Sequence, residues 1–556
     1  MVTTDAPTQR ARGRSFGMPN RWSVLTLLCA AFLLGPILAV FYAATGDSEG
    51  LWRHLSETVL PGYIANTLVL MAGVGALSLL FGVSSAWVVT RYEFFGRQSL
   101  EWLLLLPAAV PAYIIAYTYT DFLEYAGPVQ GMLRALFGWH SARDYWFPEI
   151  RSMGGAILVM GSVLYPYVYM MARTAFKLTP YSLFEIAQIH DQGLFRQVGL
   201  PMARPAIVAG LALVLMETIS DFGTVDYFAV QTLTLGIFNV WLGMNNLPAA
   251  AQIAAMSFVF VIALLALEYF ARSRRRYTDT SRRAVGFAPE RAPPPRAAAC
   301  LFICLTPVVI GFLVPVSVLI HFVLRGYTDT DLAAVTTVAF NSIGISLMVA
   351  VIVMALAGFM VFVSTFRASP FLKVMTAVSS TGYAFPGTIL AIGVVAFSGA
   401  LDSGLDTLRD WVLGDATGGF LTGTIGLVLL ACTVRFLAVG YGAVTSGVGR
   451  LPPNMLNASR VLGRNFPQSL REVVLPLVRS SFLAGGLLVF VDVMKELPMT
   501  LLLRPFNFET LATYVYQFAK DELLEQAALP ALFVVLSGVG PVILMNAALR
   551  RVGQKR

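Results

Sequence analysis

Apolar runs of about twenty residues recur along the whole chain, and they constrain its fold more than any other feature. A helix of this length spans the roughly 30 Å hydrocarbon core of a bilayer. Hydrophobic residues make up 57% of the chain and charged residues 13%, whereas soluble domains carry roughly 25% charged residues. A soluble core this apolar would leave too little polar surface to cover it. We therefore predict an all-α polytopic membrane protein.

Twelve segments have the expected length and apolarity, six in each half of the chain. They lie at 22–43, 64–90, 101–121, 153–176, 203–230 and 249–271, and at 299–323, 338–364, 374–400, 419–444, 478–502 and 527–549. This divides the chain into an N-terminal tail (1–21), a first half (22–271), a linker (272–298), a second half (299–549) and a C-terminal tail (550–556). The linker is rich in arginine and contains three consecutive prolines, which indicates a flexible connection. Most of the 39 Lys and Arg residues fall in the tails, the linker and the loops on one side, so the positive-inside rule places both termini in the cytoplasm.

The two halves repeat each other at an offset of 275 residues. The matching pairs are Asn66 and Asn341, Pro111 and Pro386, Pro201 and Pro476, Glu217 and Asp492, and Asp221 and Glu496. An even number of spans per half means that both halves enter the membrane from the same side. They are parallel repeats, related by an axis along the membrane normal, and we expect a transport pathway to run between them.

Each half also carries a polar loop that ends in Leu-Pro just before an apolar run, near 177–203 and near 450–478. In the second copy, Gly463 supplies the turn that ends a first short helix. Pro476 fits the first turn of the next helix. The pattern predicts a short helix, a sharp turn and a second helix on the cytoplasmic face, where a partner docks twice.

This loop resembles the EAA loop of binding-protein-dependent ATP-binding-cassette (ABC) importer permeases, whose pattern is Glu-Ala-Ala, three residues, Gly, and about a dozen residues to Leu-Pro. The spacing is kept in the second copy by Asn457, Ala458, Ser459, Gly463 and Pro476. The first copy has Glu185, Ala187, Gly193 and Pro201, but it is three residues shorter from Glu to Pro and its Gly is displaced. The alternative is a pair of amphipathic connectors with no partner.

The resemblance covers nearly the whole chain and implies a type I ABC importer permease fold in a bacterial inner membrane, with two permease halves fused in one chain. It implies two cytoplasmic ATPase subunits as partners, one docked on each loop, and an extracytoplasmic substrate-binding protein. The chain itself has no Gly-x-x-x-x-Gly-Lys-Ser/Thr phosphate loop. We therefore expect no catalytic residue and no cofactor on this chain, with ATP and magnesium bound in the partner subunits, and no nucleic acid as a partner.

Two pairs of carboxylates fall inside predicted spans, where a charge costs about 2.5–3.5 kcal/mol on insertion scales. Glu217 and Asp221 are four residues apart, so one face of a helix is expected to carry both. The repeat places Asp492 and Glu496 on the matching helix. We predict that the four line the transport pathway, because carboxylate oxygens suit a hard cation such as Fe³⁺. The alternative is a structural network neutralised by Lys495 and Arg435, and no resident metal ion is assigned.

Further candidate oxygen ligands nearby are Tyr113, Tyr117, Tyr119 and Tyr227, for which the alternative is a role in packing or at the membrane interface. The segments 221–228 and 495–512 resemble the fifth span of ferric-iron importer permeases and its counterpart in the second half, which implies ferric iron as the cargo. Permeases for thiamine, 2-aminoethylphosphonate, sulfate, molybdate or polyamines share the fold and the loop, so another solute is an alternative. A twelve-span secondary transporter is a further one, although it would not need the paired loops.

Overall fold

In the computed structural model, helices form nearly all of the chain, as its apolar runs predict. The structure describes residues 21–189, 193–273, 289–326, 330–366, 369–413, 419–452 and 455–554. The first half contains α1 (Arg21–Ala44), α2 (Leu51–Thr58), α3 (Leu60–Arg91), β1 (Tyr92–Glu93), α4 (Arg97–Leu103), η1 (Leu106–Ala109), α5 (Ala112–Leu123), α6 (Pro128–Phe137), α7 (Met153–Leu178), α8 (Tyr181–Ile189), η2 (Phe195–Gly199), α9 (Leu200–Ser220), α10 (Gly223–Tyr227), α11 (Leu233–Phe238), η3 (Asn239–Gly243) and α12 (Leu247–Ser273).

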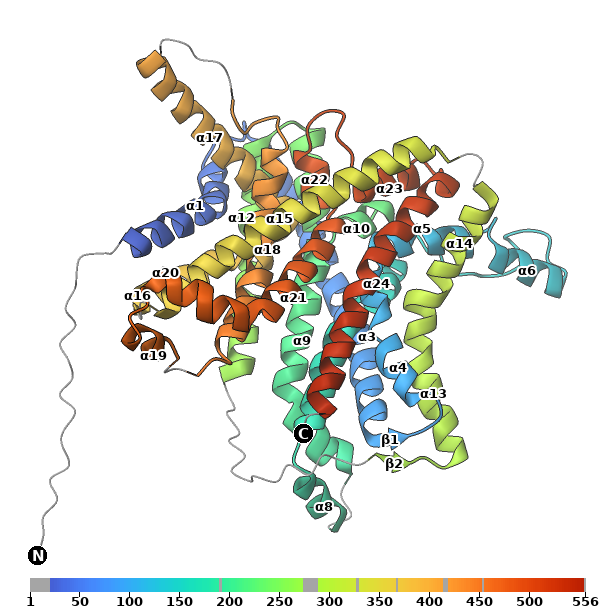
Figure 1. Cartoon of the computed structure of the whole chain (residues 1–556). Coiled ribbons are helices and arrows are strands. Elements are labelled where there is room, and N and C mark those ends of the chain that lie inside the picture. Colours follow the sequence, from blue (N-terminus) through green and yellow to red (C-terminus); the bar gives the residue numbers. More distant parts are fainter. Residues whose placement is uncertain are drawn as a thin grey trace, which may run out of the picture.

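The second half begins at a short strand and is likewise almost entirely helical (Figure 1). It contains β2 (Glu290–Arg291), α13 (Pro294–Val308), η4 (Val309–Leu313), α14 (Val314–Gly326), α15 (Leu332–Phe366), α16 (Pro370–Ser379), η5 (Gly382–Ala384), α17 (Gly387–Leu413), α18 (Gly426–Val448), α19 (Met455–Val461), α20 (Phe466–Ser469), η6 (Leu470–Val474), α21 (Leu475–Met494), α22 (Pro498–Leu503), α23 (Leu511–Lys520) and α24 (Leu524–Gln554).

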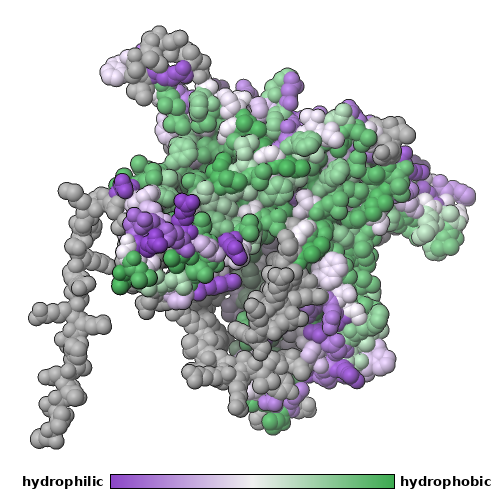
Figure 2. Space-filling model, in the orientation of Figure 1, coloured by the Kyte–Doolittle hydropathy of each residue, from purple (hydrophilic) through white to green (hydrophobic). Residues whose placement is uncertain are grey.

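Ten helices in the described residues are long and apolar enough to cross a membrane, or eleven if a pair of helices bent by 93° counts as one span. That pair is α4 with η1 followed by α5 with α6. The predicted last span, 527–549, falls within α24, whose described apolar part is Leu524–Gly540. The multi-pass helical architecture is confirmed, and the count of twelve spans stays a prediction. Figure 2 shows apolar residues across the middle of the visible face.

Four predicted spans are not single helices. The span predicted at 374–400 breaks between α16, which ends at Ser379, and α17, which begins at Gly387. The span predicted at 101–121 breaks between α4 and α5, where Pro107 and Pro111 supply no N–H group to a continuous helix. The span predicted at 203–230 ends at Ser220, because Asp221 has extended backbone angles (φ −67°, ψ 128°). The span predicted at 478–502 ends at Met494, and a separate short helix, α22, begins at Pro498. A hydropathy profile does not reveal these breaks, because the helical segments before and after each break are both apolar.

The first helix of each half packs against the other half. Helix α1 contacts α17, α16 and α15 of the second half, while α13 and α14 contact α3, α4 and α5 of the first (Figure 1). Glycines permit the close approach at both places: a Cβ on Gly393 would lie 2.1 Å from the Pro36 carbonyl oxygen, and one on Gly311 would lie 2.3 Å from that of Ser162. Small residues of this kind let helix backbones meet in a membrane. The two halves are thus interlocked rather than laid side by side.

The end of the predicted linker is attached to the first half. Strand β2 pairs in parallel with β1, and Arg91 forms an ion pair of 2.5 Å with Glu290. The Ala292 N–H donates to the Glu93 carbonyl at 3.1 Å. Residues 274–288, which hold most of the predicted flexible segment, lie outside the described residues, as do 1–20 of the N-terminal tail. The linker therefore rejoins the first half before α13 begins.

Candidate functional site

A cavity of about 150 Å³ lies between the two halves. The first half contributes the break before α5, part of α7 and the junction between α9 and α10, and the second half contributes η5, α18 and the junction between α21 and α22. All four of the predicted pathway carboxylates line it, namely Glu217, Asp221, Asp492 and Glu496. The sequence repeat therefore identified groups that the fold brings to one place, although the repeat alone says nothing of their partners.

Asp221 and Glu496 hold the two short helices that follow the broken spans. Asp221 accepts hydrogen bonds from the N–H groups of Thr224 (2.9 Å) and Val225 (3.4 Å). Glu496 accepts from the N–H groups of Met499 (3.0 Å) and Thr500 (2.9 Å). Each carboxylate thereby satisfies first-turn donors that have no partner within their own helix.

This geometry corrects one prediction. Glu217 and Asp221 do not share the face of one helix, and neither do Asp492 and Glu496, because α9 and α21 end between the members of each pair. The hydroxyl groups of Thr224 and Thr500 also donate to the two capping carboxylates, at 3.0 and 2.9 Å. The matching Thr three or four residues after each acidic residue is the signal in the sequence that indicates a cap.

Glu217 and Asp492 lie in the last turns of α9 and α21 and contact different groups. The Tyr383 hydroxyl, from η5 of the other half, donates to Glu217 Oε1 at 2.6 Å. Asp492 Oδ1 lies 3.6 Å from Lys495 Nζ. The Lys495 ammonium also reaches the Ala108 carbonyl oxygen of the first half at 3.5 Å. These contacts join the two halves across the cavity, and sequence reasoning missed Tyr383 because its partner is 166 residues away.

The basic groups of the expected structural network are present in the same cavity. Arg435 is 6% exposed, and its Nη1 lies 4.0 Å from Glu496 Oε1. Its Nε and Nη1 atoms have no hydrogen-bond partner in the described part of the chain. Four carboxylates therefore face two cations, so the geometry accommodates both a cation pathway and a neutralising network. Among the described residues, no three His, Cys, Asp or Glu side chains lie close enough together to hold a metal ion.

Only one of the four predicted oxygen-bearing tyrosines lines this cavity. That residue is Tyr113, whose buried hydroxyl has no hydrogen-bond partner among the described residues. Tyr117 is buried elsewhere in the first-half core, and the Tyr119 hydroxyl donates to the Ile310 carbonyl at 2.8 Å. Tyr227 lies under the Arg151 guanidinium, 5.2 Å from it. Burial in helix packing accounts for the positions of Tyr117 and Tyr119, and the contact with Arg151 accounts for that of Tyr227.

A second set of contacts joins the halves at the ends of α10 and α23. Asp226 of the first half lies 3.2 Å from Lys520 Nζ of the second and accepts a hydrogen bond from the Tyr516 hydroxyl. Arg151 in the first half pairs with Glu522 in the second at 3.0 Å. In Figure 1 these elements lie at the end of the molecule away from α8. The halves are therefore held together both at the cavity and at this end.

The first predicted docking loop packs part of α8 onto the end of α3. Ala187 is 4% exposed and belongs to a small core with Phe184 and Val198, against which Trp87 packs. Glu185 is exposed, and so are the large apolar side chains of Ile186 (53%) and Ile189 (80%). Gly193 is exposed and does not have a positive φ. The loop thus presents an apolar surface, and its glycine makes no left-handed turn.

The second loop has the sharp turn that the sequence predicts. Gly463 has φ +81° and ends the turn after α19, which confirms its predicted conformation. Ser459 is buried and donates to the Ser469 hydroxyl at 2.7 Å, while Ala458 is exposed. The backbone of Asn457 lies in α19, and its side chain falls outside the described residues. Val461 and Leu462 are 87% and 80% exposed, so this loop also presents apolar groups.

Both Leu-Pro pairs lie at the same kind of junction. Pro201 and Pro476 each stand in the first turn of an α-helix, α9 or α21, as predicted for Pro476. However, neither helix begins there, because the π-helical turns η2 and η6 run directly into them. The apolar helical rods extend over Phe195–Ser220 and Pro467–Met494. Short π-helical turns of this type often mark functional positions in helices.

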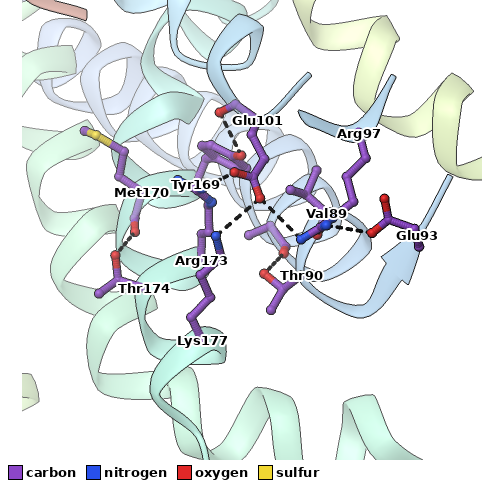
Figure 3. A network of polar contacts seen from close by, with 11 residues as sticks. Val89, Thr90, Glu93, Arg97, Glu101, Tyr169, Met170, Arg173, Thr174 and Lys177 are labelled. Carbon is purple, nitrogen blue, oxygen red and sulfur yellow. Dashed lines mark hydrogen bonds and ion pairs between the residues drawn. The ribbon is translucent and has the colours of Figure 1, made fainter. Parts of the chain in front are cut away.

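A polar network that sequence reasoning did not identify braces the first half next to its loop (Figure 3). Glu101 of α4 pairs with Arg173 at 2.5 Å, with Lys177 at 3.2 Å and with Arg97 at 3.5 Å. The Tyr169 hydroxyl donates to the Glu101 carbonyl oxygen at 3.2 Å. Because Glu101 and the last turn of α7 are both partly buried, the network fixes the helix that leads into α8.

The sequence is similar to those of several permease proteins. The chain is 24% identical to the Fe(3+)-transport system permease protein FbpB 2 of Haemophilus influenzae, over 95% of this chain and 99% of that protein. It is 28% identical to the probable molybdenum ABC transporter permease protein HVO_B0370 of Haloferax volcanii, over 45% of this chain and 90% of that protein. It is 30% identical to the sulfate transport system permease protein CysW of Escherichia coli, over 36% of this chain and 67% of that protein. No family model matches the chain.

Proposed function

The chain belongs to the permease subunits of ABC importers, and we propose that ferric iron is the cargo that it moves across a bacterial inner membrane. The assignment of ferric iron rests on the extent of the similarity to the ferric permease. That similarity covers both halves, the linker and nearly all of both chains. The molybdenum and sulfate permeases match less than half of this chain, in agreement with a duplicated permease unit. The subunit is a transport component and not an enzyme.

Permeases of this family work with ATPase subunits and a binding protein. We infer that two copies of one ATPase dock here. One docks on α8 with its exposed Ile186 and Ile189, and the other docks at the end of α19, where Val461 and the following Leu462 are exposed. The two loops lie well apart in Figure 1, which suits two separate partners. ATP and magnesium are bound in those partners. The proposal includes twelve spans in two parallel sets of six, with both termini cytoplasmic, which the distribution of Lys and Arg supports.

The proposed transport path runs through the cavity between the halves. Its carboxylates Glu217 and Asp492 have no capping role, so they are free to exchange partners when the halves move. Tyr383 and Lys495 are those partners in this conformation. ATP binding brings the two ATPase subunits together and tilts the halves, which alternates access to the cavity from the binding protein on one side and from the cytoplasm on the other. Transient contacts with the carboxylate oxygens of the cavity suit a hard cation such as Fe³⁺.

A tetrahedral oxyanion is the second candidate, and a specific observation favours it. Arg435 and Lys495 place two cations in the cavity, and a guanidinium or an ammonium group recognises an oxyanion well. The relative named for sulfate is an oxyanion permease with 30% identity to this chain over the part that it matches. The carboxylates around these cations oppose this candidate, because they repel an anion at short range.

The test is uptake by the whole complex in proteoliposomes that contain this chain, its ATPase and its binding protein. We expect ATP-dependent accumulation of radioactive ferric iron, and stimulation of ATP hydrolysis by the iron-loaded binding protein. Accumulation of molybdate or sulfate without iron uptake would assign the second candidate. Uptake by this chain alone, driven by an ion gradient and insensitive to ATP, would instead indicate a secondary transporter.

A further inference from the structure

The loop between α5 and α7 forms a helix, α6, that projects sideways from the bundle (Figure 1). Its apolar residues follow helical spacing along one face, at positions i, i+3, i+4, i+7 and i+8. They are Val129, Met132, Leu133, Leu136 and Phe137. Three of them are largely exposed: Met132 at 65%, Leu136 at 71% and Phe137 at 59%. None of the five belongs to a hydrophobic core of the described residues.

The side of α6 next to this apolar face is tied to its own loop. Gln130 donates to the Leu123 carbonyl at 2.7 Å and accepts from the Tyr145 hydroxyl at 2.6 Å. Arg134 donates to the Tyr125 carbonyl at 2.8 Å, and its guanidinium lies 4.0 Å from the centre of the Tyr125 ring. These contacts fix the rotation of the helix about its axis. The apolar face therefore cannot turn inward without breaking them.

Aromatic residues continue the apolar face beyond the end of the helix. Phe137, Trp139 and Tyr145 stack in a row, with ring centroids 4.8 and 4.7 Å apart. Trp146 is 85% exposed. Trp and Tyr are enriched where a protein meets the boundary between lipid and water, since each ring has an apolar body and a polar group.

We propose that α6 lies in the surface of the bilayer, with its apolar face in the lipid between headgroups and acyl chains. An amphipathic helix with one strongly apolar face takes this position. The neighbouring span supports lipid as the occupant, because α14 exposes Ile320 (46%) and Leu324 (77%) on the surface of a membrane-crossing helix. In Figure 2 the lower side of the α6 region is apolar and its upper side is polar, which sets one face toward lipid and one toward water.

The position has a mechanical consequence for the first half. Helix α6 follows α5, which carries Tyr113 to the cavity, and the same loop leads to Arg151, which pairs with Glu522 of the other half. A helix anchored in the lipid surface would hold this end of the first half at a fixed depth. The second half is then the one that moves relative to the membrane at this end.

The test uses a fluorescent thiol label at one of two positions in the full complex, reconstituted in lipid. A label at Leu136→Cys reports on the apolar face, and a label at Arg143→Cys, which is exposed in the same loop, is the matched control. Brominated phospholipid in the bilayer and iodide in the buffer are the two quenchers. We expect the label at 136 to lose most of its fluorescence to the brominated lipid and little to iodide, and the label at 143 to show the reverse.

Equal quenching of both labels by iodide would overturn the proposal. Shielding of the label at 136 from iodide only after the binding protein is added would also overturn it, and would make α6 a protein-docking face. Met132→Cys provides an independent position on the apolar face, for which the same result as at 136 is expected. Both side chains are exposed, so the substitutions leave the fold intact.

Discussion

The two loops make opposite predictions for the same substitution at their glycines. Gly463 has φ +81°, and nothing lies within 4 Å of the position that a Cβ would occupy. An alanine there meets no atom but must adopt the left-handed conformation, which costs an L-residue about 1–2 kcal/mol. Gly193 also has open space around it, but its φ is not positive. An alanine at 193 is therefore free of strain and stabilises slightly, by about 0.4–1 kcal/mol, through the unfolded chain.

A cost of one or two kcal/mol corresponds to a factor of roughly 5–30 in an equilibrium. If the turn at Gly463 must form for the ATPase to dock on α19, then Gly463→Ala should weaken that association by about this factor. Gly463→Asn should fall between the alanine variant and the native protein, since asparagine tolerates the left-handed region better than alanine does. Gly193→Ala should leave association unchanged. Each variant is measured by titrating purified ATPase onto the permease and by the transport rate of the complex.

Two outcomes would contradict this reasoning. Native affinity and transport in Gly463→Ala would mean that the turn is not needed for docking. An equal loss in Gly193→Ala would mean that the two loops respond to any added side chain, whatever the backbone conformation. The melting temperature of each permease alone serves as the control, because a local turn should change it little compared with the loss in association.

Three further predictions concern the cavity and the contacts between the halves. The double variant Glu217→Gln with Asp492→Asn should lower iron uptake while the melting temperature stays close to native, because neither carboxylate caps a helix; unchanged uptake would make the pair structural. Glu496→Ala should lower the free energy of unfolding by about 0.5–2 kcal/mol, the range for caps replaced by alanine. Thermal denaturation measures this loss, and a native melting temperature would refute the capping role. Asp226→Asn should weaken the contact with Lys520 and lengthen the distance between spin labels on α10 and α23, whereas an unchanged distance would show that this contact does not hold the halves together.

The sequence predicted where the chain crosses the membrane better than how it crosses. Apolar length locates the spans, because the bilayer requires about twenty residues in a helix. It misses the breaks at Pro107 and Asp221, since a break between two apolar segments leaves mean hydropathy unchanged. The capping roles of Asp221 and Glu496 could have been predicted from the sequence, because Thr224 and Thr500 follow them at the spacing of a helix cap.

Other features of the site depend on tertiary structure that one sequence does not reveal. The bond between Tyr383 and Glu217 joins residues on opposite halves and has no local signal. The same holds for the pairing of Arg151 with Glu522 across the end of the bundle. The repeat at 275 residues did predict that four carboxylates gather, because parallel repeats place matching helices about one axis. The repeat did not reveal that one carboxylate of each pair caps a short helix and the other does not. This difference follows from where α9 and α21 end.

The non-capping carboxylates lie on the helices that lead from the docking loops to the cavity. A continuous helical rod runs from Phe195 to Ser220, so the end of the first loop, after α8, and Glu217 are on the same rigid element. The matching rod, Pro467–Met494, carries Asp492. From Pro201 to Glu217 the rise is about 24 Å at 1.5 Å per residue. A partner that displaces either loop tilts its rod as a unit and moves the non-capping carboxylate, while the capping carboxylate stays with the short helix beyond the break. The relative movement of these two carboxylates, rather than a change within one helix, is how force applied at the loops would reach the cavity.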